Sequence, residues 1–154
     1  MRIWCDPENM PEEAILSKMK EGANFCIDSE GIDSQRIEVS LTLVSEEEIR
    51  QLNHSYRNVD KITDVLSFPQ YEDLGQLPEE GEIPLGDVVI CVKRVKEQAA
   101  EFGHSEAREM VYLFIHSICH LLGYDHMEED EKRQMRKKEE ETMAKICMER
   151  SKNE

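Results

Sequence analysis

The run over residues 106–122 restricts the fold of this chain more than any other segment. Apolar side chains such as Val111 and Ile118 occupy several sides of the helix expected there, so a helix lying on the surface would expose some of them. Ser105 before the run is a favourable N-cap, and Gly123 after it can adopt the positive φ that ends a helix. We therefore expect a buried central helix around which the rest of the chain packs.

The remaining segments predict strands and helices that can cover this helix. Residues 37–43 alternate apolar and polar side chains, which is typical of a half-buried strand, whereas residues 86–92 form a continuous apolar run that indicates an interior strand. We expect two shorter strands, at 2–6 and at 65–68, and Pro69 ends the second of them. A capping box is expected at 45–48 and an exposed loop at 70–84. Further helices are expected at about 10–26, 46–54 and 93–102, and from about 128 onward. This order predicts an α+β fold, with one domain over residues 1–154 in which about five helices cover a four-stranded mixed sheet.

Three histidines lie close together in HSICHLLGYDH, residues 116–126. His116 and His120 are four residues apart, so a helix places both on nearly the same face, with two imidazole nitrogens available to one ion. His126 follows the glycine turn and can fold back toward that ion. Ordinary histidines on a buried helix are the alternative, but HxxxHxxGxxH matches a known three-histidine zinc pattern. We predict one Zn²⁺ ion bound by these three residues, with an open fourth position of the kind found in catalytic sites.

The residue after the first histidine limits the chemistry of such a site. In zinc peptidases with this spacing it is a glutamate, which takes a proton from the metal-bound water. Here it is Ser117, whose hydroxyl is not a general base near neutral pH unless a second base activates it. Cys119 lies on another helical face and is expected in the core, while His54 and His104 are expected at the surface or at helix ends. The site should therefore hydrolyse a bond by a route other than the usual peptidase one.

A polar stretch, NHSYRNVDKITDVLSFP at residues 53–69, offers a group for phosphate. The planar guanidinium of Arg57 suits a phosphate, because it donates two parallel hydrogen bonds, but spacing alone slightly favours an ion pair with Asp60 or Asp64. Thr63 and Asp64 are expected to hold the loop around Arg57 through bonds to its backbone.

The net charge, the N-terminal sequence and the cysteines limit the binding partners and the cellular location that we expect. A net charge of −15 argues against nucleic-acid binding through a general positive field, so an RNA surface would need a few selected basic residues. The N-terminus lacks the features of a secretory signal, and the five scattered cysteines, without a CxxC pair, are typical of reduced thiols. No apolar run approaches the roughly 20 residues that span a bilayer. We expect a cytoplasmic protein with neither a membrane nor DNA as its partner.

The segments NHSYRNVDKITDVLSFP, GDVVI and HSICHLLGYDH closely resemble the YbeY family of bacterial endoribonucleases, which act in ribosomal RNA maturation. The resemblance runs from about residue 43 to residue 131, and the family commonly has glycine at the position of Ser117.

This resemblance implies a zinc ion held by His116, His120 and His126, with Arg57 and His116 as the catalytic residues. It also implies metal-dependent cleavage of single-stranded ribosomal RNA, work at the 3′ end of the small-subunit RNA, a part in ribosome quality control, and association with the small ribosomal subunit. A metallopeptidase-like hydrolase, or a non-enzymatic ribosome assembly factor with a structural zinc, remain the alternatives. The residues themselves predict the metal and its open position, whereas the RNA substrate comes from the resemblance.

Overall fold

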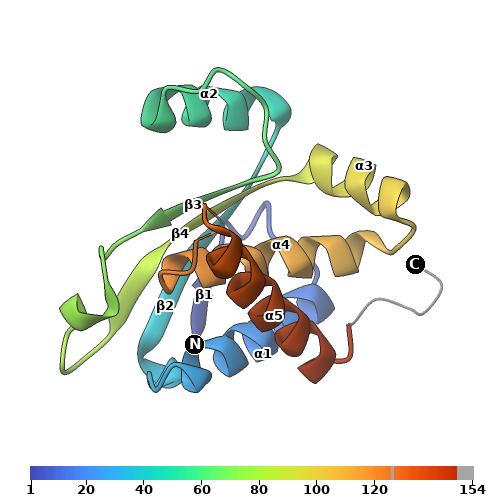
Figure 1. Ribbon diagram of the computed structural model, residues 1–154. Helices are drawn as coiled ribbons and strands as arrows, with labels where there is room; N and C mark the ends of the chain where they lie inside the picture. Colours follow the sequence, from blue (N-terminus) through green and yellow to red (C-terminus); the bar gives the residue numbers. More distant parts are fainter. Residues whose placement is uncertain (126, 149–154) are drawn as a thin grey trace.

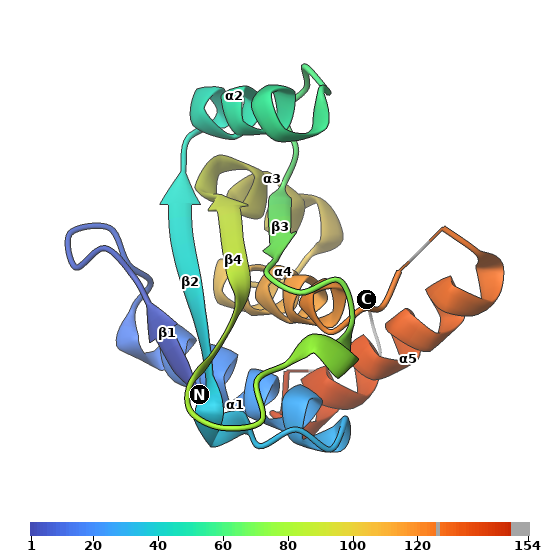
Figure 2. The same cartoon turned by 90° about the vertical axis from the view of Figure 1, so that its left-hand side faces the viewer.

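A single four-stranded mixed sheet runs through the computed structural model, which describes residues 1–125 and 127–148 (Figures 1 and 2). The strands are β1 (Arg2–Trp4), β2 (Ile37–Val44), β3 (Val65–Pro69) and β4 (Ile83–Cys91), in the order β1-β2-β4-β3. The first two pairings are parallel, and β3 runs antiparallel to β4. The continuous apolar run is therefore interior, as predicted, but β4 starts at Ile83 rather than at residue 86, because Ile83 already pairs with Ile37 of β2.

Five α-helices complete the predicted α+β fold: α1 (Glu13–Ser29), α2 (Glu46–Arg57), α3 (Val92–Phe102), α4 (Glu106–Leu121) and α5 (Glu129–Lys145), with short 3₁₀ turns at Ser34–Arg36 and Leu74–Gln76. The expected capping box starts α2, since Ser45 accepts from the backbone of Glu48 and the Glu48 side chain accepts from the backbone of Ser45. The prediction that α2 ends near His54 was wrong. It continues to Arg57 and ends at Asn58, which adopts the left-handed conformation with φ 57°.

The helix that carries the histidines is central. Ten of the sixteen residues of α4 are buried, and the helix contacts α1, α3, α5, β3 and β4. Figure 1 shows α4 lying along one side of the sheet. Phe114 and Ile118 of α4 are fully buried there and belong to the same apolar cluster as Val88 and Ile90 of β4. Within the described ranges, no helix combines the length and the apolar character needed to cross a membrane.

Among the described residues, α2 is the helix that packs on the opposite side of the sheet, at one end of it. Successive side chains of β4 point to opposite faces of the sheet. Val89 and Cys91 therefore pack with Ile49 of α2, whereas Val88 and Ile90 pack on the side of α4. Figure 2 shows α2 across this end of the sheet. Thr42 of β2 and Asp87 of β4 are exposed. The end of α2 is thereby placed beside the edge strand β3.

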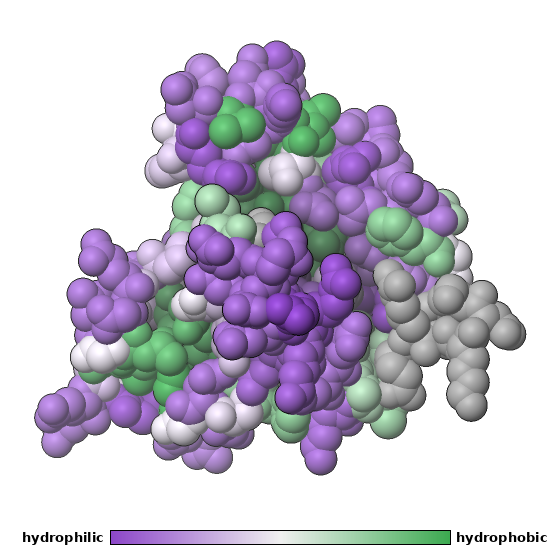
Figure 3. All heavy atoms as spheres, in the orientation of Figure 1, coloured by the Kyte–Doolittle hydropathy of each residue, from purple (hydrophilic) through white to green (hydrophobic). Residues whose placement is uncertain are grey.

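The last helix, α5, packs against the rest of the protein along one narrow side. Its buried residues are Met135, Glu139, Thr142 and Met143. The surface that α5 presents to solvent is strongly hydrophilic (Figure 3). A buried glutamate among these four is unusual, because a charged side chain is rarely buried unless it is paired.

Candidate active site

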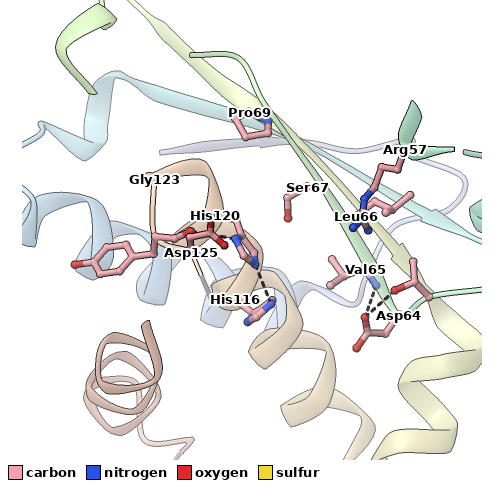
Figure 4. A pocket seen from close by; sticks show the side chains of 12 residues that line it. Arg57, Asp64, Val65, Leu66, Ser67, Pro69, His116, His120, Gly123 and Asp125 are labelled. Atoms are coloured by element: carbon pink, nitrogen blue, oxygen red, sulfur yellow. Dashed lines mark hydrogen bonds between the residues drawn. The ribbon is translucent and has the colours of Figure 1, made fainter. Parts of the chain in front are cut away.

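A cavity of about 510 Å³ lies between the end of α4 and the edge strand β3 (Figure 4). Its lining comes from the end of α2, the segment entering β3, β3 itself, the end of α4 and the turn after it: Arg57, Thr63, Asp64, Val65, Leu66, Ser67, Pro69, His116, His120, Gly123, Tyr124 and Asp125. The structure thus brings together three of the predicted site residues, Arg57, His116 and His120. The fourth, His126, lies outside the described residues.

The two histidines of α4 meet as their spacing predicts. The Nε2 atoms of His116 and His120 are 3.2 Å apart, and their rings are nearly perpendicular, at 86°. Both side chains point from the last two turns of α4 toward the cavity (Figure 4).

The other nitrogen of each ring has a hydrogen-bond acceptor. His116 Nδ1 lies 2.6 Å from the Glu139 carboxylate, and His120 Nδ1 lies 3.1 Å from the backbone carbonyl of Tyr124. In a neutral imidazole, an acceptor at Nδ1 places the proton on that atom and leaves the lone pair on Nε2. This protonation pattern is the one that metal-binding histidines need.

The donor set fits zinc. The 3.2 Å contact between the two Nε2 atoms can be bridged by a proton or by a metal ion, and a tetrahedral zinc with Zn–N bonds of about 2.0–2.1 Å separates its nitrogens by about 3.3 Å. In residues 1–125 and 127–148 no third His, Cys, Asp or Glu joins this pair to form a group of three. The predicted third ligand is His126, on which the described residues give no geometry.

Glu139 is a site residue that the sequence reasoning missed. Its side chain is buried on α5, one carboxylate oxygen contacts His116, and the other accepts a 2.9 Å hydrogen bond from the Tyr112 hydroxyl. Burial, reinforced by the negative charge of Glu139, raises the pKa of Tyr112, so the hydroxyl stays protonated and donates. Its spacing in the sequence could have indicated that Glu139 is buried. It lies four residues from both Met135 and Met143, on the same apolar stripe of the helix.

Ser117 faces the sheet and is completely buried. Its Oγ lies 2.5 Å from the Oγ of Ser67 on β3, so one hydroxyl hydrogen-bonds the other. The partner is thus a hydroxyl, not an imidazole or carboxylate that would activate the serine as a base. The geometry agrees with the expectation that Ser117 does not replace the peptidase glutamate.

Arg57 reaches the cavity from the last turn of α2, on the side opposite the histidines (Figure 4). The two aspartates considered as its ion-pair partners, both described, bond elsewhere. Asp60 accepts two hydrogen bonds from Arg50, at 2.8 and 3.2 Å, which lower the pKa of Asp60. Asp64 accepts from the backbone N–H of Val65 at 2.8 Å. The guanidinium of Arg57 is exposed and directed to a cavity that also holds the histidine pair.

The segment after Arg57 is held differently from the prediction. Thr63 donates to Asp64, and Asp64 accepts from Val65, so this pair stabilises the start of β3. The turn itself is held by Asn53, whose side-chain amide donates to the carbonyl of Lys61 at 3.0 Å.

The turn after α4 behaves partly as expected. Gly123 has φ +100°, as predicted for a helix stop. The hydroxyl of Tyr124 is not available to a further partner, because it donates to Glu30 at the end of α1 at 2.5 Å, and burial together with this bond raises the pKa of Tyr124. Asp125 lines the cavity and does not cap α5, whose N-cap residue is Glu128.

The residues expected outside the site are outside it. Cys119 is buried in the core, and His54 is exposed. His104 lies between α3 and α4, but its side chain is only 4% exposed, because it pairs with the buried Glu109 at 2.7 Å. A helix-end position was therefore correct for His104, and a surface position was not.

Comparisons with known proteins agree with the three motifs. The family model described as Endoribonuclease YbeY matches residues 5–147, well beyond the segment in which the resemblance is visible by eye. A protein named Endoribonuclease YbeY from Caldicellulosiruptor bescii is 46% identical over 125 residues, covering 77% of this chain and 79% of that protein. One of the same name from Clostridioides difficile is 44% identical over 134 residues, covering 87% of each.

A solved structure supports the fold. The solution structure of TM1509 from Thermotoga maritima matches with a TM-score of 0.63 and 30% identity, covering 95% of this chain and 89% of the other. The family model and the curated relatives each extend over most of the chain. The chain therefore belongs to the Endoribonuclease YbeY family.

Proposed function

We propose that this protein is a zinc-dependent endoribonuclease that cleaves single-stranded RNA, with its substrate at the 3′ end of small-subunit ribosomal RNA and a part in ribosome quality control at the small subunit. The observation that carries the nuclease proposal is the arrangement of one cavity, in which Arg57 lies opposite the paired Nε2 atoms of His116 and His120. The printed names of the relatives support the reaction class. The ribosomal substrate rests on the family resemblance, and the expected cytoplasmic location rests on the five scattered cysteines, which are typical of reduced thiols.

The residues divide the work between the two walls of the cavity. His116, His120 and the predicted ligand His126 would hold the zinc ion, which when bound supplies a Lewis acid that lowers the pKa of a water to about 7 and polarises a phosphate oxygen. Arg57 donates two parallel N–H groups to non-bridging phosphate oxygens, and its positive charge stabilises the negative charge that grows during phosphodiester cleavage. Ser117, bonded to Ser67, takes no proton.

An exposed aromatic ring beside Arg57 favours a single-stranded substrate. Tyr56 is 70% exposed, and its ring packs edge-to-face on Phe68 with centroids 5.2 Å apart. Stacking of an unpaired base on such a ring contributes about 1–3 kcal/mol and requires no particular base. Tyr56 does not line the cavity itself, so such a base would stack outside it, next to the end of α2 that carries Arg57.

The overall charge predicts that the protein binds free RNA weakly. The net charge is −15, and the cavity wall itself includes Asp64 and Asp125. Long-range attraction of RNA requires clustered cations, so binding must depend on a few short-range contacts or on a ribosomal partner that presents the strand.

The test measures cleavage of a labelled single-stranded ribosomal RNA fragment by zinc-loaded protein, chelated protein, Arg57→Ala and His120→Ala. Arg50→Ala is the matched control, because it removes the same charge from the same helix while Arg50 points to Asp60. We expect Arg57→Ala to lower the rate constant about 100- to 1,000-fold, chelation and His120→Ala to abolish cleavage, and Arg50→Ala to keep it.

Other outcomes contradict the proposal in identifiable ways. Equal cleavage by every sample indicates a contaminating nuclease. Absence of cleavage both on free RNA and on purified small subunits favours the assembly-factor alternative. Chelator-sensitive turnover of an unstructured protein, without RNA cleavage, favours the peptidase alternative.

A further inference from the structure

The environment of Glu139 differs from that of its neighbours on α5. Glu140 and Glu141 are exposed to solvent, whereas Glu139 is 5% exposed. Met135 and Met143, one turn before and one turn after it, are also buried and keep water from this part of the helix. A buried carboxylate is costly unless hydrogen bonds compensate for the lost hydration.

Both oxygens of this carboxylate are engaged by the same face of α4. Oε2 lies 2.6 Å from His116 Nδ1, and Oε1 accepts from the Tyr112 hydroxyl at 2.9 Å. Tyr112 and His116 are four residues apart, so they lie one above the other on the helix, with ring centroids 6.2 Å apart. Two separate donors therefore define both the position and the rotation of the Glu139 carboxylate.

The Nδ1 atoms of the two histidines have acceptors of different kinds. His120 donates its Nδ1 proton to a neutral carbonyl within its own helix-ending turn, that of Tyr124. His116 donates to a carboxylate that comes from another helix, 23 residues away in sequence. A carboxylate acceptor holds the imidazole ring more firmly than a carbonyl does.

We propose that Glu139 is the positioning residue of the metal centre, and that Tyr112 holds it in place. Glu139 keeps the proton of His116 on Nδ1 and sets the plane of the ring, so that Nε2 is directed beside Nε2 of His120. The metal affinity of the cavity then depends on the docking of α5, although α5 contributes no ligand. This inference rests on the proposed zinc site, but it is independent of which bond the protein cleaves.

The experiment measures the zinc Kd of the full chain by competition with a chromophoric chelator, without RNA. The variants are Glu139→Gln, Glu139→Ala, Tyr112→Phe and His120→Ala, with Glu141→Gln as the matched control, because it removes the same charge from an exposed position of the same helix. Glu139→Gln keeps the shape and an acceptor for Nδ1, so it preserves folding better than Glu139→Ala. Circular dichroism and the Tm of the zinc-free proteins identify any variant that does not fold.

We expect Glu139→Gln to weaken zinc binding about 10- to 100-fold, with a larger loss for Glu139→Ala and a smaller one for Tyr112→Phe. Glu141→Gln should bind as wild type does. The visible spectrum of the Co²⁺-loaded protein should also change in Glu139→Gln and not in Glu141→Gln, since an altered His116 geometry changes the ligand field. A merely structural role for Glu139 would change the Tm and leave both readouts as they are.

Failure of this inference is distinguishable from failure of the nuclease proposal. If folded Glu139→Gln and Glu139→Ala bind zinc as wild type does, Glu139 is not a positioning residue, even if the wild type cleaves RNA. If Glu139→Gln loses affinity while no sample cleaves RNA, the inference holds and the nuclease proposal fails. If wild type and His120→Ala bind zinc equally weakly, there is no zinc site and both fail.

Discussion

At the scale of single residues, the hydrogen-bond partner decides what a buried polar side chain can do in this cavity. Ser117 and Glu139 are both buried. Ser117 contacts β3 and Glu139 contacts α4, and both of these elements line the cavity. Ser117 bonds the hydroxyl of Ser67, which leaves it neutral and links α4 to β3. Glu139 bonds the imidazole of His116 and so affects a predicted metal ligand directly. The first contact joins two packed elements, and the second joins Glu139 to a residue that we propose as a metal ligand.

A substitution at Ser117 separates these roles. Ser117→Ala removes one buried hydrogen bond, so we expect a loss of about 1 kcal/mol in the free energy of unfolding, measured by urea denaturation. RNA cleavage should continue at the wild-type rate, because no proton passes through this hydroxyl. Ser55→Ala, at an exposed position of α2, is the control for the hydroxyl itself. A tenfold or greater fall in cleavage by a folded Ser117→Ala protein would assign the hydroxyl to the reaction.

At the scale of elements, the site depends on how closely β3 approaches β4 and α4. Gly86 of β4 pairs with Pro69 at the end of β3, beside the cavity wall. A Cβ placed on Gly86 would lie 2.5 Å from the carbonyl oxygen of Phe68 and 2.8 Å from Cδ2 of Leu121. The first neighbour is backbone within the sheet, so it cannot move without disturbing the strand pairing. The glycine is therefore needed for close packing of the three elements.

Gly86→Ala should consequently destabilise the protein by about 1–3 kcal/mol, through overpacking added to its positive φ, as measured by the urea midpoint. Gly81→Ala is the matched control, since Gly81 also has a positive φ, of +81°, but a Cβ there meets nothing within 4 Å. The difference between the two variants isolates the contact with β3. Equal losses would mean that backbone strain alone, and not the approach of Phe68, explains the requirement for glycine.

At the scale of the whole molecule, the core is built without the metal-binding residues. The side chains between α4 and the sheet, such as Phe114, Ile118 and Val88, are fully buried and apolar. Their burial provides the main driving force for folding, at roughly 25 cal/mol for each Å² of apolar surface removed from water. The fold should therefore form without zinc, and zinc should add stability only by binding to the folded chain.

Removal of the metal tests this view. At a free zinc concentration 100 times the Kd, binding adds about 2.7 kcal/mol, which corresponds to a Tm increase of roughly 5–10 °C for a chain of this size. We expect a chelator to abolish this increase while the far-UV circular dichroism at 25 °C stays unchanged, and His120→Ala to show no zinc-dependent increase. Unfolding of the chelated wild type at 25 °C would identify the zinc as structural instead.

Two errors of the sequence reading have local explanations. The polar stretch predicts a loop around Arg57, but α2 continues to Arg57 and ends where Asn58 adopts the left-handed conformation. Residues 70–84 predict a loop because they are rich in Gly, Pro and acidic residues, yet Ile83 and Pro84 already pair with β2. In β4, pairing with a neighbouring strand outweighed this local preference.

The features that the sequence by itself determined depend on residues at most a few positions apart. The four-residue spacing places His116 and His120 on the same face of one helix, and Gly123 ends that helix with a positive φ. Backbone geometry dictates such relations, because a helix places residues i and i+4 on one face. The alternation of apolar and polar side chains likewise predicts the strand β2, and the apolar residues on several sides of α4 predict a buried helix. Neither prediction requires knowledge of the elements that pack against them.

Only the tertiary structure decided which distant residues complete the site. Glu139 meets His116 across 23 positions and Ser67 meets Ser117 across 50, while Arg57 reaches the same cavity from another helix. No periodicity encodes these contacts, because they depend on the angles at which α2, α4 and α5 pack on the sheet. Packing of apolar surfaces sets those angles, and it thereby selected one glutamate of a highly charged helix to face the histidine and left its neighbours in water.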